Sequence, residues 1–179
     1  MIEDAAAWNR LAALLPEPEA LGFRDCWSIG EQEAGLGVLV SGILAHHALI
    51  SETVRAEISV LAEAWGEREA LTPRILQCPG NGAPAELKLI EHDDGTDHEP
   101  VDGSGPELAG LFLVPWVGCT RCGQVLMRAH SRESRGDLSY LAHHYVITSP
   151  DRATVLRVFP ADSVSVAFSA LLGYCAEPT

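Results

Sequence analysis

Two cysteines separated by two residues carry the clearest potential chemistry in the chain. Cys119 and Cys122 lie in the segment GCTRCG and are followed at once by Gly123. A CxxCG turn can direct both sulfurs to one metal ion, and zinc favours thiolate ligands. A closed structural zinc site needs four ligands, but the sequence contains no second CxxC. The pair is therefore half of a candidate zinc site.

The other half of a zinc site would have to come from distant parts of the chain. Cys78, in the segment QCPGNG, could join Cys119 and Cys122, and one histidine would complete a Cys3His site. The spacing forces no single histidine among His92, His98, His130, His143 and His144. If a metal is bound, we expect a structural zinc ion with His130 as the fourth ligand. The alternative is two unliganded thiols in a loop and no cofactor.

A redox role is a second interpretation of the same cysteines. The segment FLVPWVGCTRC is similar to the strand and tryptophan that lead into the CxxC of thioredoxin-like proteins, and Pro150 would face the dithiol. In that family the first thiolate lies at a helix N-terminus, which lowers its pKa. Here Gly123 follows the pair directly, and only 27 residues separate Cys122 from Pro150. A thiol oxidoreductase is therefore the weaker alternative.

Motifs of common enzyme classes are absent from the sequence. There is no GxSxG, HExxH, P-loop or GxGxxG. The segment HDDGTDHEPVDGSGPE offers histidines and carboxylates that could hold a divalent ion, but their spacing matches no named site. Its lack of apolar periodicity and its many turn formers favour a solvated acidic loop. We expect a binding protein rather than an enzyme.

The net charge of −13 limits the kind of partner. Residues 1–73 carry a net charge of −8 and residues 74–107 a net charge of −6, whereas residues 108–179 carry +1. An acidic surface repels the phosphate backbone, so nucleic acid is excluded as a direct ligand. A basic protein is the partner that this charge suits, and a solvated surface without a partner is the plain alternative.

The sequence predicts a helical N-terminal part over residues 1–73. A first helix covers 5–15, and a capping box of Ser28 and Glu31 starts a second. A third helix, whose apolar residues share one face, starts at Ser51. We expect LGFRDCW to be a loop and the second and third helices to form an antiparallel pair. Three glycines at 35, 37 and 42 reduce helix propensity but could allow close packing.

From residue 74 the pattern changes to short apolar runs separated by turn formers. Strands are predicted at ILQC, ELKLIEH, LAGLFLVPW, QVLMRAH, HHYVIT and TVLRVF, and a closing helix over 162–173. The fold class is therefore α+β, with a helical part at 1–73 and a mostly antiparallel sheet with a C-terminal helix at 74–179. The two parts could also form one compact domain.

The expected location is the cytoplasm. The N-terminus MIEDAAAW has acids where a signal peptide needs bases, and the most apolar run, AGLGVLVSGILAHHALI, is short and polar for a membrane span. Five cysteines at irregular spacing favour reduced thiols over a disulfide framework. We therefore expect no membrane partner.

The segment 25–69 resembles the small helical immunity proteins of bacterial polymorphic toxin systems. The shared features are a helix after I-G-E, an A-G-L-x-x-L-V stretch, a turn at A-L-I-S and an acidic second helix. The matching positions look structural, and the family has neither this length nor the CxxC half. They are Glu31, Gly35, Leu36, Leu39, Ser51, Ile58 and Leu61.

This resemblance implies a non-enzymatic inhibitor that occludes the active surface of a cognate toxin. The negative charge of residues 1–107 fits a basic toxin, because complementary charge speeds association and selects partners. The candidate contacts are acids that we expect to be exposed: Glu52, Glu57, Glu63, Asp93, Asp94 and Asp97. The alternative is a zinc-binding accessory protein that depends on Cys119 and Cys122.

Overall fold

The protein has an α+β fold, with helices mostly in the N-terminal part and an antiparallel sheet in the C-terminal part. The computed structural model describes residues 5–90, 106–134 and 136–174. The chain divides into two compact units, which we call the helical unit (Met1–Ala85) and the sheet unit (Glu86–Thr179). The helical unit extends beyond residue 73, where we expected it to end, because a further helix follows the third predicted one.

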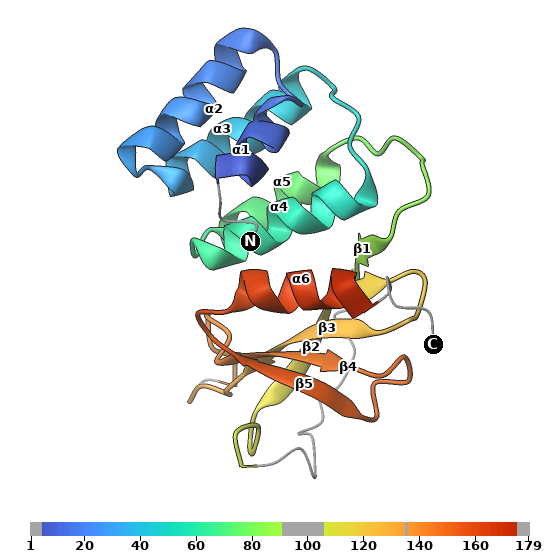
Figure 1. Ribbon diagram of the computed structural model, residues 1–179. Helices are drawn as coiled ribbons and strands as arrows, with labels where there is room; N and C mark the ends of the chain where they lie inside the picture. Colours follow the sequence, from blue (N-terminus) through green and yellow to red (C-terminus); the bar gives the residue numbers. More distant parts are fainter. Residues whose placement is uncertain (1–4, 91–105, 135, 175–179) are drawn as a thin grey trace. The chain divides into compact units, whose positions relative to one another are not determined.

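Two pairs of neighbouring helices form most of the helical unit (Figure 1). Helix α2 packs along α3, and α4 packs along α5, while the contact between α3 and α4 is smaller. The second and third predicted helices correspond to α3 and α4, so the antiparallel pair expected between them is a minor feature of the unit. The helices are α1 (Ala5–Ala12), α2 (Glu17–Ile29), α3 (Gln32–Ala45), α4 (Glu52–Ala64) and α5 (Arg68–Gln77).

Helix α2 replaces the loop expected at LGFRDCW. Phe23 is fully buried and stacks on Trp8 of α1, with ring centroids 4.2 Å apart, so burial of one aromatic face outweighs the weak helical pattern. Gly30, in the left-handed region at φ 83°, ends α2. The predicted capping box is wrong: the Ser28 hydroxyl donates to the carbonyl of Arg24 within α2, and Glu31 is the N-cap of α3 without a side-chain cap.

The start predicted for the third helix at Ser51 is confirmed. The Ser51 hydroxyl accepts a hydrogen bond from the backbone N–H of Val54 at 3.2 Å, and α4 begins at Glu52. The strand predicted at ILQC is wrong, because α5 runs through it and through Pro73. Leu71 and Ile75 lie four residues apart and are both buried, and this burial compensates for the backbone hydrogen bond that proline cannot donate.

The sheet unit contains five antiparallel strands in the order β1-β2-β3-β4-β5, so each strand pairs with its sequence neighbour. These confirm the strands predicted after residue 85, and α6 confirms the closing helix. The elements are β1 (Leu87–Leu89), β2 (Phe112–Cys119), β3 (Val125–His130), β4 (His144–Thr148), β5 (Val155–Pro160) and α6 (Val164–Tyr174). Helix α6 lies along one face of the sheet (Figure 1). All residues of β3 are buried, so both faces of this central strand are covered.

The three predicted helix glycines of α3 have two different environments. A methyl group on Gly35 would lie 2.8 Å from the Trp8 ring, and one on Gly42 would lie 2.7 Å from the Leu15 side chain. These two glycines therefore allow close packing, as expected. Gly37 differs, because nothing lies within 4 Å of the same position.

No helix in the described ranges is long and apolar enough to cross a membrane.

We predict opposite stability changes for Gly35→Ala and Gly37→Ala. Gly35→Ala should lower the free energy of unfolding by about 1–3 kcal/mol, because the buried Trp8 ring cannot move away without disturbing its stacking on Phe23. Gly37→Ala should raise it by up to about 1 kcal/mol through helix propensity alone. Urea unfolding followed by tryptophan fluorescence measures both, and equal effects of the two variants would contradict the assignment of these two faces.

Candidate functional site

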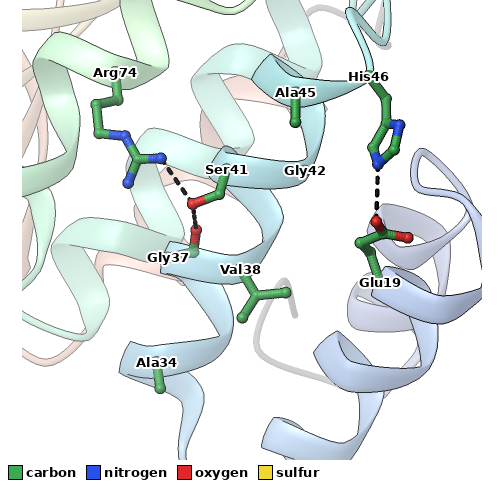
Figure 2. A pocket seen from close by; sticks show the side chains of 9 residues that line it. All are labelled: Glu19, Ala34, Gly37, Val38, Ser41, Gly42, Ala45, His46 and Arg74. Atoms are coloured by element: carbon green, nitrogen blue, oxygen red, sulfur yellow. Dashed lines mark hydrogen bonds and ion pairs between the residues drawn. The ribbon is translucent and has the colours of Figure 1, made fainter.

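An open groove runs along α3 in the helical unit. Its volume is about 520 Å³, and it is open to solvent rather than enclosed (Figure 2). Helix α2 and helix α5 contribute one lining residue each, and α3 with its C-cap contributes the rest. The lining residues are Glu19, Ala34, Gly37, Val38, Ser41, Gly42, Ala45, His46 and Arg74.

Small residues form the floor of this groove. Ala34, Gly37, Ser41 and Ala45 recur every three or four positions and therefore lie on one face of α3. At about 1.5 Å per residue, the floor from Ala34 to Ala45 is roughly 16 Å long, or three helical turns. Sequence inspection notes these small residues but cannot tell which of them face a neighbouring helix and which face solvent.

One end of the groove carries a paired carboxylate. His46 Nε2 lies 2.9 Å from Glu19 Oε1, and this hydrogen bond is the main cause that lowers the pKa of Glu19 (Figure 2). A carboxylate whose pKa is lowered by folding stabilises the folded state above its unfolded-state pKa, and this contribution is lost as the pH falls through the folded-state pKa. The Glu19 carboxylate at this end of the groove therefore already has a hydrogen-bond partner within the unit.

The α5 side of the groove carries an arginine with a different environment. Arg74 Nη2 donates to the Ser41 hydroxyl at 2.7 Å, and that hydroxyl donates to the Gly37 carbonyl at 2.6 Å (Figure 2). Arg74 makes no ion pair with any carboxylate in the described part of the chain. The positively charged guanidinium of Arg74 is thus positioned at the groove by the uncharged Ser41 hydroxyl.

The other four arginines of the helical unit are all paired with glutamates. Arg10 pairs with Glu57, Arg24 with Glu17, and Arg55 with Glu52. Arg68 contacts both Glu63 and Glu69. Cations from α1, α2, α4 and α5 therefore neutralise carboxylates within the unit itself, and Arg74 stands apart from this pattern.

These ion pairs change the set of predicted partner contacts. Glu52 is partly exposed and pairs with Arg55 at 3.1 Å. The prediction that Glu57 and Glu63 are exposed is wrong, since they are 6% and 7% exposed and their carboxylates face Arg10 and Arg68. The periodicity of α4 did not show this, because a buried carboxylate needs a partner from another helix. The loop acids Asp93, Asp94 and Asp97 lie outside the described residues.

Three exposed acids of the helical unit lie where α2 turns into α3. Asp25, Glu31 and Glu33 are exposed, and none of them makes an ion pair within the described residues. Ile29 lies between them in the sequence and is 72% exposed. We call Asp25, Ile29, Glu31 and Glu33 the acidic corner. The charges in the sequence could have located the acidic corner. They could not have shown which acids form ion pairs with arginines of other helices.

The CxxC pair lies in the hairpin turn between β2 and β3. Cys119, the last residue of β2, is buried, whereas Cys122 is exposed. The Gly123 N–H donates to the Cys119 carbonyl at 3.1 Å, and Gly123 takes φ 74°, which favours glycine. Pro150 does pack against this turn, 3.0 Å from where a Gly123 methyl group would lie. The pair is not at a helix N-terminus, so the thioredoxin-like means of lowering a thiol pKa is not provided here.

The structure does not bring His130 to these cysteines. His130 pairs with Phe112 at the end of the β2–β3 ladder that lies away from the cysteines. Phe112 precedes Cys119 by seven residues along β2, and at about 3.3 Å per residue the two ends are roughly 23 Å apart. Its Nδ1 instead lies 2.7 Å from the Ser139 carbonyl oxygen. His143 and His144 lie at the same end, since His144 pairs with Ala129.

Cys78 belongs to the helical unit, where it is the C-cap of α5. Burial raises the pKa of its thiol. Across residues 5–90, 106–134 and 136–174, no group of three or more His, Cys, Asp or Glu side chains could hold a metal ion. His92 and His98 lie outside those ranges.

Comparison of the chain with models of protein families, with curated proteins and with solved structures gives no match.

We predict that the thiols of Cys122 and Cys78 differ strongly in reactivity. At pH 7.5, iodoacetamide should alkylate the exposed Cys122 at least about tenfold faster than the buried Cys78, whose raised pKa also reduces its thiolate fraction. Peptide mapping by mass spectrometry gives both rates, and alkylation in urea is the control that should bring them close together. Equal rates in the native state would contradict the burial of Cys78. Protection of Cys122 by stoichiometric zinc would indicate that the hairpin turn holds metal.

Proposed function

We propose that this chain is a cytoplasmic, non-enzymatic binding protein, an immunity-type inhibitor that covers the active surface of a basic toxin domain. The observation that carries the proposal is the acidic corner, where three exposed carboxylates lack a cationic partner within the described residues. The helical unit uses four of its arginines on other glutamates, so the corner keeps its full negative charge. A basic partner would supply the missing countercharge.

The corner also has the composition of a protein interface. Asp25 lies one helical turn before Ile29 and therefore shares its face of α2. An exposed apolar side chain flanked in sequence by exposed acids has the composition of a docking site, in which the apolar centre loses water and the charged rim sets specificity. Scattered exposed apolar residues are ordinary, but Ile29 lies within four residues of three exposed carboxylates.

Inhibition of this kind needs no chemistry from the inhibitor. A toxin that acts on nucleic acid binds phosphates through lysine and arginine side chains. Carboxylates of the corner would engage those same cations and compete with the substrate, while the bulk of the helical unit blocks access. Long-range attraction would raise the association rate at low salt, and salt would reduce this effect because the Debye length is about 8 Å at physiological ionic strength.

We predict that neutralising the acidic corner slows association with the toxin. The triple variant Asp25→Asn/Glu31→Gln/Glu33→Gln should lower the association rate about tenfold at low salt, and the difference should shrink as salt is added. The matched control is Glu107→Gln/Glu133→Gln/Asp137→Asn, which removes three exposed charges from the sheet unit and should change the rate less than about twofold. Stopped-flow or surface binding kinetics give both rates.

The biological test is protection of cells. The chain is co-expressed with the toxin domain encoded beside it in its genome, and survival is scored for the wild type, the corner variant and the control variant. Survival that requires the wild type or the control, and fails with the corner variant, supports the proposal. The absence of a neighbouring toxin gene, or survival that does not depend on the chain, would overturn it.

A further inference from the structure

We propose that the groove along α3 binds a helix of the protein partner, and that this helix presents an acidic side chain to Arg74. The inference rests on the proposed function only in taking the occupant to be a protein. It adds a second contact surface, distinct from the acidic corner and opposite to it in the charge that it selects.

The shape of the groove favours a helix over a small molecule. Small-molecule sites are concave and bury most of the ligand surface, whereas this groove is open to solvent. Its floor, roughly 16 Å long, matches about three turns of a helix lying against α3. Recognition of an amphipathic helix in a groove is read through side chains at i, i+3, i+4 and i+7, and the floor residues have the same spacing.

The floor allows the backbone of a second helix to come close. Gly37 has no side chain, and no heavy atom from elsewhere in the described residues, apart from its own stretch of helix, lies within 4 Å of where its Cβ would be. Helices separated by small residues approach toward the short end of the usual range of about 8–10 Å between axes. Gly35 and Gly42 already serve such close approach within the unit, against Trp8 and Leu15. Gly37 offers the same opportunity toward solvent.

The charge at the groove sets the chemistry of the incoming helix. Arg74 is the one arginine of the described helical unit whose guanidinium has a hydroxyl and no carboxylate as side-chain partner. A guanidinium has five N–H donors in a planar fork, so the Ser41 contact leaves donors for a carboxylate. Glu19 is hydrogen-bonded to His46 at the C-terminal end of α3, so that carboxylate already has a partner within the unit. The occupant is therefore a helix with a small apolar stripe and one Asp or Glu.

The test uses displayed libraries of 15-residue helical peptides sorted on the full chain. Peptides enriched on the wild type should share small or apolar residues at i, i+3, i+4 and i+7 and an Asp or Glu at one fixed position. Gly37→Leu fills the groove and should weaken their binding at least tenfold. Gly22→Leu is the matched control, because Gly22 lies in α2 with open space around it and does not line the groove, and it should leave binding unchanged.

The arginine variant tests the charge selection separately. Sorting on Arg74→Gln should remove the preference for Asp or Glu over Asn or Gln while keeping the apolar stripe. Equal binding of the enriched peptides to wild type and Gly37→Leu would overturn the proposal, as would enrichment without an acidic position. Concentration-dependent dimerisation that Gly37→Leu abolishes would also overturn it, since the occupant would then be a second copy of the chain.

The two proposals fail in different ways. If cells are protected through the acidic corner but no peptide discriminates between the wild type and Gly37→Leu, the groove inference is wrong and the inhibitor proposal stands. If peptides select the groove as described but no toxin is neutralised, the groove is a helix-binding site in a protein of another function.

Discussion

The packing of Trp8 against the bare backbone of Gly35 is the contact on which the helical unit depends. Trp8 is almost completely buried, stacks on Phe23 of α2, and reaches α3 only because Gly35 has no side chain. This contact fixes how α3 is rotated about its own axis. Gly42 lies seven residues on, nearly two full turns, and so faces the same side and meets Leu15.

Rotation of α3 then determines what its other side presents. Gly37 lies two residues from Gly35, about 200° around the helix, so anchoring Gly35 toward the core turns Gly37 away from it. Ala34, Ser41 and Ala45 share that outward face, and together with Arg74 of α5 and the Glu19–His46 pair they make the groove. The groove follows from the core packing, because the buried contacts of Gly35 and Gly42 fix the orientation of α3 and so determine which residues its opposite face presents.

Charge in the helical unit is organised by local compensation. Arg10 reaches from α1 to Glu57 on α4, and Arg68 reaches from α5 to Glu63 on α4, so two carboxylates that would be costly when buried acquire partners. Among the described residues, Asp25, Glu31 and Glu33 at the turn between α2 and α3 are exposed and make no ion pair. The acidic corner therefore carries three carboxylates that no arginine of the unit compensates. The sheet unit, by contrast, buries Cys119 at the end of β2.

The sequence alone determined the fold class, the strands after residue 85, the start of a helix at Ser51 and the concentration of negative charge, because periodicity, turn residues and charge are local properties. It misjudged LGFRDCW and ILQC, where one buried aromatic or two buried aliphatic side chains outweighed weak local propensity. It also could not assign Glu57 and Glu63 to the interior. Which glycine packs and which stays open, and which carboxylate is compensated, depends on residues of other helices. Only the tertiary structure decided these points, since a side chain's environment is set by the helix that packs against it and not by its own neighbours in sequence.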